Sequence, residues 1–190
     1  MQREISGKSE LDFLKDTDLK RTIEDSIQYI QIIFKLAKNS KSNLYKEETY
    51  RVIVLYVVSI IEAVLLYILN TRNEKINYID YKHTSPISEK FKHVDLPDDT
   101  VVIAVQKQLT KNNKNIGFVE LVDFMRRNDL IAEKFAQEIL DLNNIRNTFH
   151  FTKPRNKITC EIEVIEKAFE LLLKVIENAP VAILTHPPRE

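Results

Sequence analysis

The sequence predicts an all-α protein, an antiparallel up-and-down helical bundle with one long irregular crossover and extra short helices. Three observations support this fold class. The 190 residues include only two glycines, Gly7 and Gly117, so turn-rich β architectures and glycine-lined phosphate loops are poorly supported. Apolar residues recur every three or four positions in several stretches, and a nearly continuous apolar run covers residues 52–69. Helices are therefore the default structure.

Length and composition favour a single helical domain over residues 1–190. Its core is expected at about residues 17–178, between a polar N-terminal start and a solvated C-terminal tail. The 28 basic and 28 acidic residues balance, so the chain lacks the overall positive charge of a non-specific nucleic-acid binder, although a local basic patch is still allowed. A single cysteine and the absence of a signal-peptide pattern predict a cytoplasmic location.

Two long helices are predicted in the first third of the chain. The first ends at the polar run 39–42, and the second runs to about Asn70 with Glu47 and Glu48 in its first turn, where carboxylates favour the positive end of the helix dipole. The second helix is apolar almost all round, as a buried central helix is. Glu62 inside it argues against a membrane span, because an unpaired carboxylate near mid-bilayer costs roughly 2.5–3.5 kcal/mol. We therefore expect no membrane association. The apolar stripe of the first helix is Leu19, Ile23, Ile27, Ile30, Phe34 and Ala37.

The middle of the chain has less regular periodicity. Residues 71–99 carry scattered aromatic, histidine and proline residues, so we expect an irregular crossover with short helical turns. A modest helix is predicted over about residues 98–111, and another begins near Gly117. A further helix is expected after Asn128, and a last one begins at a Thr159 cap and stops at Pro180.

The strongest candidate for chemistry is the pair Arg146 and His150, one helical turn apart. Residues at i and i+4 share a helix face, and on a helical wheel this pair borders the apolar stripe that contains Leu142. Groups at such a border line clefts and interfaces. Pro154 is expected to end the helix, and a basic turn of three residues surrounds it: Lys153, Arg155 and Lys157.

Two interpretations of the pair are open. Cations near a helix C-terminus interact well with the helix dipole, and Asn147 can satisfy terminal carbonyls, which needs no function. Alternatively, Arg146 holds two phosphate oxygens while His150 transfers a proton, and the ribose 2′-OH of RNA supplies the nucleophile without a metal. RNA cleavage needs both a general acid and a general base, and one histidine alone is poorly suited to supply both. Two such motifs across a homodimer axis would supply two arginines and two histidines.

The motif Arg146-Asn147-Thr148-Phe149-His150, together with the acidic residue in Ile61-Glu62-Ala63 of a hydrophobic helix, resembles the HEPN superfamily over about residues 17–178. The resemblance implies an all-α bundle, homodimerisation and metal-independent ribonuclease activity, in toxin–antitoxin, phage-defence or RNA-processing roles. It also implies an antitoxin or a nucleotidyltransferase-like partner. By this resemblance Arg146 and His150 are the catalytic pair on an RNA substrate. The supporting residues are Asn147, Asn143 and Glu62, and the phosphate-binding or RNA-binding residues are Lys153, Arg155 and Lys157.

Other functions stay open beside the ribonuclease. Three residues separate Arg146 from His150, whereas many active members of the superfamily have four to six. The alternative is a non-catalytic helical module that binds a nucleotide, an RNA or a protein partner through the same cleft, and a third possibility is a purely structural interaction protein. Glu62 is explained about as well by a buried carboxylate that is hydrogen-bonded within the bundle.

The remaining candidates are weaker. His83 and His93 lie in the crossover without a second pair of ligands at metal spacing, and His186 lies in the expected tail, so we expect no metal site and no cofactor. Cys160 has no obvious base near it along the sequence, which favours a buried or inert thiol. A basic rim, or merely a solvated helix end, is formed by Arg126, Arg127 and Lys134.

Overall fold

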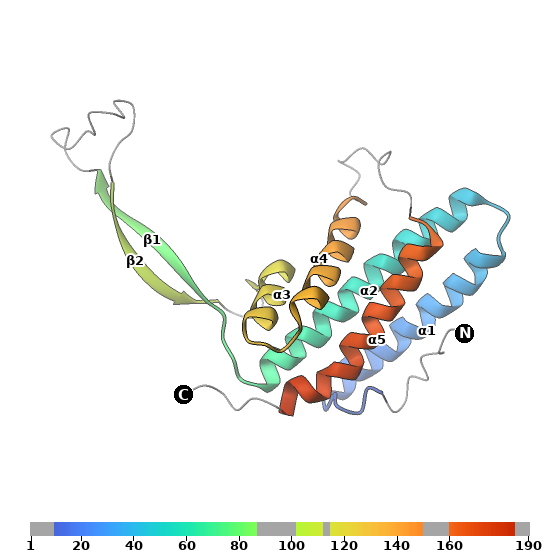
Figure 1. The fold of residues 1–190 in the computed structure, drawn as a ribbon, viewed down its shortest axis with the longest axis horizontal. Helices are drawn as coiled ribbons and strands as arrows, with labels where there is room; N and C mark the ends of the chain where they lie inside the picture. Colours follow the sequence, from blue (N-terminus) through green and yellow to red (C-terminus); the bar gives the residue numbers. More distant parts are fainter. Residues whose placement is uncertain (1–9, 87–101, 112–114, 150–159, 185–190) are drawn as a thin grey trace. The chain divides into compact units, whose positions relative to one another are not determined.

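A computed structural model describes residues 10–86, 102–111, 115–149 and 160–184 (Figure 1). Within these ranges the chain is mostly helical, which confirms the predicted all-α class. The chain divides into two compact units, one formed by Met1–Glu74 with Gly117–Glu190 and the other by Lys75–Ile116. The first unit contains all five described helices, and the second contains a two-stranded sheet.

Helix α1 (Thr17–Asn39) begins at Asp16, whose side chain accepts hydrogen bonds from the backbone N–H groups of Asp18 and Leu19. This cap satisfies donors that the first turn of a helix leaves without partners. Ser42 caps α2 (Asn43–Thr71) in the same way. Because α2 begins at Asn43, its first turn contains no acidic residue, and the predicted place of Glu47 and Glu48 in that turn is wrong. The apolar stripe predicted for the first helix is buried from Ile23 onward, while Leu19 is only half-buried.

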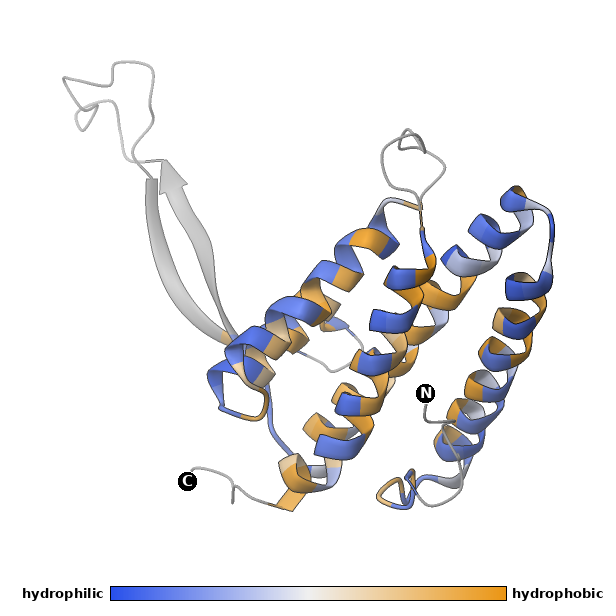
Figure 2. Cartoon of the chain, turned by 45° about the vertical axis from the view of Figure 1, so that its right-hand side comes forward, coloured by the Kyte–Doolittle hydropathy of each residue, from blue (hydrophilic) through white to orange (hydrophobic). Residues whose placement is uncertain are grey.

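Helix α2 is the centre of the bundle and packs against α1, α3 (Phe118–Arg127), α4 (Glu133–Asn147) and α5 (Ile162–Leu184). It is long and apolar enough to cross a membrane, but 56% of its most apolar window is buried inside the bundle, consistent with the core helix of a soluble protein. Figure 2 shows hydrophobic residues along the sides of the helices that face one another. The prediction of a central buried helix is therefore confirmed.

The last helix extends further than predicted. Pro180 lies inside α5 and does not stop it at that position. Two contacts stabilise the helical turn that follows Pro180. Ala182 is buried, and its carbonyl accepts a hydrogen bond from Arg72 Nη1 at 2.8 Å. Packing and this hydrogen bond offset the backbone donor that proline lacks. The proposed cap Thr159 lies outside the described residues.

The second unit corrects the prediction for the middle of the chain. The expected irregular crossover contains strand β1 (Asn77–Pro86), and the helix expected over residues 98–111 is instead strand β2 (Val102–Thr110). The strands pair antiparallel, with Asn77 opposite Thr110 and a register shift between His83 and Ser85. β2 is rich in apolar and β-branched residues, which favour strands, and periodicity alone does not separate a short apolar strand from a short helix.

Candidate functional site

Three of the predicted site residues meet where α4 packs on α2. Arg146, in the last turn of α4, donates a hydrogen bond from Nη1 to Asn143 Oδ1 at 3.3 Å. The same Nη1 lies 3.9 Å from Glu62 Oε2 on α2. The helical period explains the first contact, because residues i and i+3 are neighbours on a helix surface. The second contact joins residues on two helices that are 84 positions apart in the sequence.

These three residues differ in how far their side chains are buried. Asn143 is 3% exposed and belongs to the helix interface, whereas the side chains of Glu62 and Arg146 are 30% and 31% exposed. Arg146 therefore lies at the border of the core, where the helical wheel predicts it. Its two contacts with described residues both use Nη1, and a guanidinium carries five N–H donors, so within the described part of the chain this group has capacity for a further acceptor such as a phosphate oxygen.

The rest of the predicted site is only partly described. Asn147 is the last residue of α4, is half-buried and precedes the cap residue Thr148, whose Oγ1 donates to the carbonyl of Ile145 at 2.7 Å. His150 lies outside the described residues, as do Pro154 and the predicted basic turn of Lys153, Arg155 and Lys157. The prediction that this helix runs to Pro154 is wrong, because α4 ends at Asn147 and Thr148 is its C-cap, so α4 does not supply the helical turn expected from Arg146 to His150. The structure therefore brings Arg146, Asn143 and Glu62 together and does not place the histidine.

Sequence reasoning missed Arg51, a buried arginine beside the end of α4. Arg51 is 8% exposed, its Nη2 bonds Glu47 Oε1 at 2.5 Å, and its guanidinium carbon lies 5.6 Å from the centre of the Phe149 ring. The spacing of Glu47 and Arg51 is the favourable i, i+4 order for a helical ion pair, which is the signal that could have found it. This cation anchors Phe149, the residue directly before His150, against α2.

Cys160 is a buried thiol, as the sequence favours. It is 3% exposed, and burial raises its pKa to about 12, because an apolar environment disfavours the thiolate. The positive charge of Arg51 lowers this pKa and the negative charge of Glu47 raises it, and both effects are smaller than that of burial. This environment suits an inert structural cysteine more than a nucleophile.

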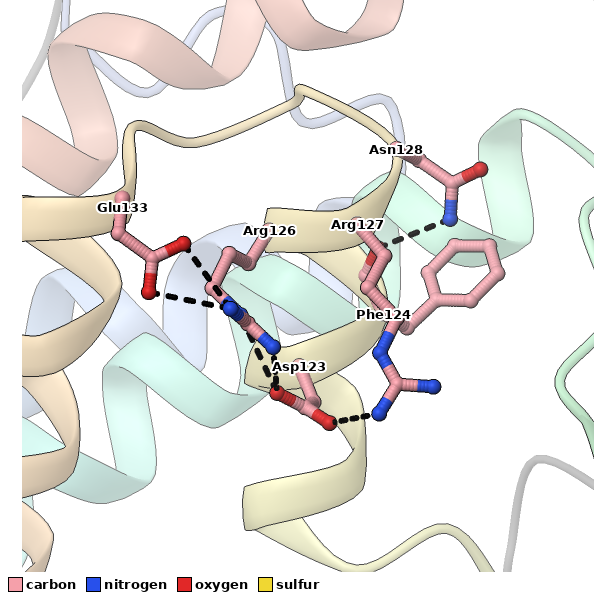
Figure 3. Close-up of polar contacts among 6 residues, drawn as sticks. All are labelled: Asp123, Phe124, Arg126, Arg127, Asn128 and Glu133. Carbon is pink, nitrogen blue, oxygen red and sulfur yellow. Dashed lines mark hydrogen bonds and ion pairs between the residues drawn. The ribbon is translucent and has the colours of Figure 1, made fainter.

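Figure 3 shows that the arginines of the possible basic rim are paired with carboxylates. Arg126 bridges α3 and the first turn of α4, with Nη1 at 2.9 Å from Glu133 Oε2 and Nη2 at 2.9 Å from Asp123 Oδ1. Arg127 Nη2 lies 2.6 Å from Asp123 Oδ2. The hydrogen bonds that Arg126 donates to Glu133, and then those to Asp123, raise the pKa of Arg126 further. Arg126 ties α3 to α4, and Arg127 pairs within α3. Because both guanidinium groups are matched by carboxylates, they are poorly placed to act as a phosphate-binding rim.

Among the described residues, no group of three or more histidine, cysteine, aspartate or glutamate side chains is placed to hold a metal ion. The side chain of His83 is not described, and His93 and His186 lie outside the described ranges. In comparisons with protein-family models, curated proteins and solved structures, none matches the chain.

Proposed function

We propose that this chain is an HEPN-like endoribonuclease that cleaves RNA without a metal at the cleft of a homodimer, in a toxin or defence role in the cytoplasm. The observation that supports it is the partly exposed Arg146, held by Asn143 on its own helix and faced by Glu62 from α2. An arginine that is oriented by two partners but one-third exposed is suited to bind an oxyanion. The expected antitoxin or nucleotidyltransferase-like partner belongs to the same proposal.

In this proposal Arg146 binds the non-bridging oxygens of the scissile phosphate and stabilises the negative charge that grows on them in the transition state. Asn143 and Glu62 hold the guanidinium and reduce the entropy lost when phosphate binds. The ribose 2′-oxygen attacks phosphorus and gives up its proton, the bond from phosphorus to the 5′-oxygen breaks, and that oxygen takes up a proton. His150 transfers these protons. The products are a 2′,3′-cyclic phosphate and a 5′-hydroxyl.

A homodimer makes this chemistry more effective. Cleavage needs a base for the 2′-hydroxyl and an acid for the leaving oxygen, and one histidine provides one of them at a time. Two copies related by a two-fold axis would bring a second Arg146 and a second His150 to a shared cleft. The position of Arg146 at the border of the core supports this arrangement, because such groups are accessible to a neighbouring copy.

The test is cleavage of mixed RNA in EDTA by the wild-type chain and by Arg146→Ala and His150→Ala. Each variant is expected to lower the cleavage rate by about 100-fold or more. Arg21→Ala is the matched control, because the Arg21 side chain is 83% exposed and contacts only the nearby Asp25 at 3.9 Å among the interactions described for it. Cleavage that all variants retain refutes the proposal. RNA binding that requires Arg146 without cleavage by the wild type replaces the ribonuclease with a binding module.

A further inference from the structure

Exposed large apolar side chains are concentrated on one pair of helices. The structure describes ten such residues. Seven of them lie on α1 or α2, and three lie elsewhere. A soluble protein scatters single apolar residues over its surface, whereas a cluster of this size marks an interaction site. We call this cluster the α1–α2 face: Tyr29, Ile32, Leu36, Leu44, Tyr45, Leu55 and Tyr56.

The α1–α2 face has a protruding end and a hollow end. The protruding end lies near the turn 40–42 that joins the two helices, where Leu36 and Leu44 are 57% and 70% exposed. The hollow end is a groove of about 280 Å³ further along both helices, lined in part by the small side chains of Ser26, Ser59 and Ala63. Large side chains at one end and a groove with small side chains at the other make the face complementary to itself.

We infer that the α1–α2 face binds a second copy of this chain, with the two-fold axis near Tyr29 and Val52. A two-fold interface uses the same patch on both copies, so the protruding end of each copy must meet the hollow end of the other. The axis then passes midway between the ends. Tyr29 and Val52 lie about twelve residues on either side of the turn 40–42, and the Tyr29 ring is 5.2 Å from that of Tyr56, about one helical turn beyond Val52 on α2.

The size of the α1–α2 face fits a dimer. Its seven side chains are 37–70% exposed, so each offers on the order of 100 Å² of surface and together they offer roughly 700 Å². A stable interface of standard size buries about 800 Å² on each partner. The residues that line the groove carry no charge, which disfavours a nucleic acid, because phosphate contacts need lysine or arginine.

The α1–α2 face also reaches the candidate site. Ala63 lines the groove, and Glu62, which faces Arg146, directly precedes it on α2. A second copy on this face would therefore lie beside the Arg146 site. The inference rests on the proposed function only for this role of the dimer in catalysis; the apolar surface itself supports the interface.

The first test measures the mass of the full chain by light scattering over a range of concentrations. Wild type is expected to dimerise, and Leu36→Glu is expected to raise the dimer dissociation constant at least 100-fold, because it buries a carboxylate without a partner. Val181→Glu is the matched control, since Val181 on α5 is 55% exposed, close to the 57% of Leu36, but lies outside the face. A wild type that stays monomeric, or a Leu36→Glu variant that dimerises as well as wild type, overturns the inference.

The second test locates the axis by cross-linking with a short bismaleimide. Tyr29→Cys is expected to cross-link into dimers much faster than Val181→Cys, and wild type should not react because Cys160 is buried. Equal rates for the two variants overturn the placement of the axis. Binding of monomers to phospholipid vesicles that Leu36→Glu abolishes would assign the face to a membrane surface instead. A dimer that cleaves no RNA refutes only the ribonuclease activity. A monomer whose cleavage depends on Arg146 refutes the interface and the dimer cleft, and leaves the role of Arg146 in cleavage standing.

Discussion

Cys160 offers a quantitative check on how the chain just before α5 packs near the first turns of α2. Its thiol is 3% exposed, and burial raises the pKa from 9.0 to about 12. Only the thiolate reacts at an appreciable rate with a disulfide reagent or a haloacetamide. At pH 8 about one tenth of an ordinary cysteine is ionised, compared with about one in ten thousand at a pKa of 12. We therefore expect the folded protein to react about 1,000-fold more slowly than the unfolded chain.

The assay follows the absorbance of the aromatic thiolate released from a disulfide reagent at pH 8, in buffer and in concentrated guanidinium. The unfolded chain should release one equivalent rapidly, and the folded protein should release it slowly or only on opening. A surface variant such as Val181→Cys serves as the control, because its added thiol must react rapidly in the folded state. A Cys160 that reacts at the unfolded rate while circular dichroism shows intact helices would contradict the packing described here.

The same pKa predicts how stability depends on pH. Folding favours the protonated thiol, so this contribution is fully present below the unfolded pKa near 9 and is lost as the pH rises toward 12. Between pH 8 and pH 10 the free energy of unfolding should fall by about 1.4 kcal/mol more in wild type than in Cys160→Ala. The comparison with the variant cancels the titration of tyrosine and lysine. Parallel pH profiles for the two proteins would refute the assignment.

Three further outcomes are expected from urea denaturation. Leu65→Ala should lower the free energy of unfolding by about 2–5 kcal/mol, because Leu65 is 1% exposed in the bundle centre, whereas Leu55→Ala, at 38% exposure on the same helix, should cost less. Pro180→Ala should raise it by about 1–2 kcal/mol, since alanine restores a helix donor but loses the rigidity of proline in the unfolded chain. Glu62→Gln should change it by less than about 1 kcal/mol, because the 3.9 Å pair with Arg146 is partly exposed. A larger loss in Glu62→Gln would mean that this carboxylate is structural.

The helices were predictable because their signal is local. Apolar residues spaced by three or four along 23–37 and the caps at the chain's polar breaks define α1 without knowledge of its neighbours. The hairpin was missed because its signal is not local. Pairing between Asn77 and Thr110 joins residues 33 positions apart, and strand pairing of this kind leaves only a short, ambiguous apolar pattern in each segment.

The candidate site shows the same limit. The helical wheel places Arg146 at the border of the core, because its position depends only on the period of α4. Its contact with Glu62 depends on how α4 packs on α2, which no spacing within either helix specifies. Arg51 was missed because Glu47 and Glu48 were expected in the first turn of the helix, whereas α2 begins at Asn43 and both carboxylates pair with Arg51. Its contact with Phe149 is again one that no spacing within a helix specifies.

The composition of α2 now has a fuller explanation than burial alone. A helix that is apolar almost all round is expected to be covered on every side, yet Leu55 and Tyr56 are 38% and 37% exposed while Leu65 is 1% exposed. The helices of this chain cover the other sides of α2 and leave this one open. A second copy on the α1–α2 face would cover it. The all-round apolar pattern of α2 then reflects two kinds of packing, one within the chain and one between chains, and Glu62 lies where the two meet.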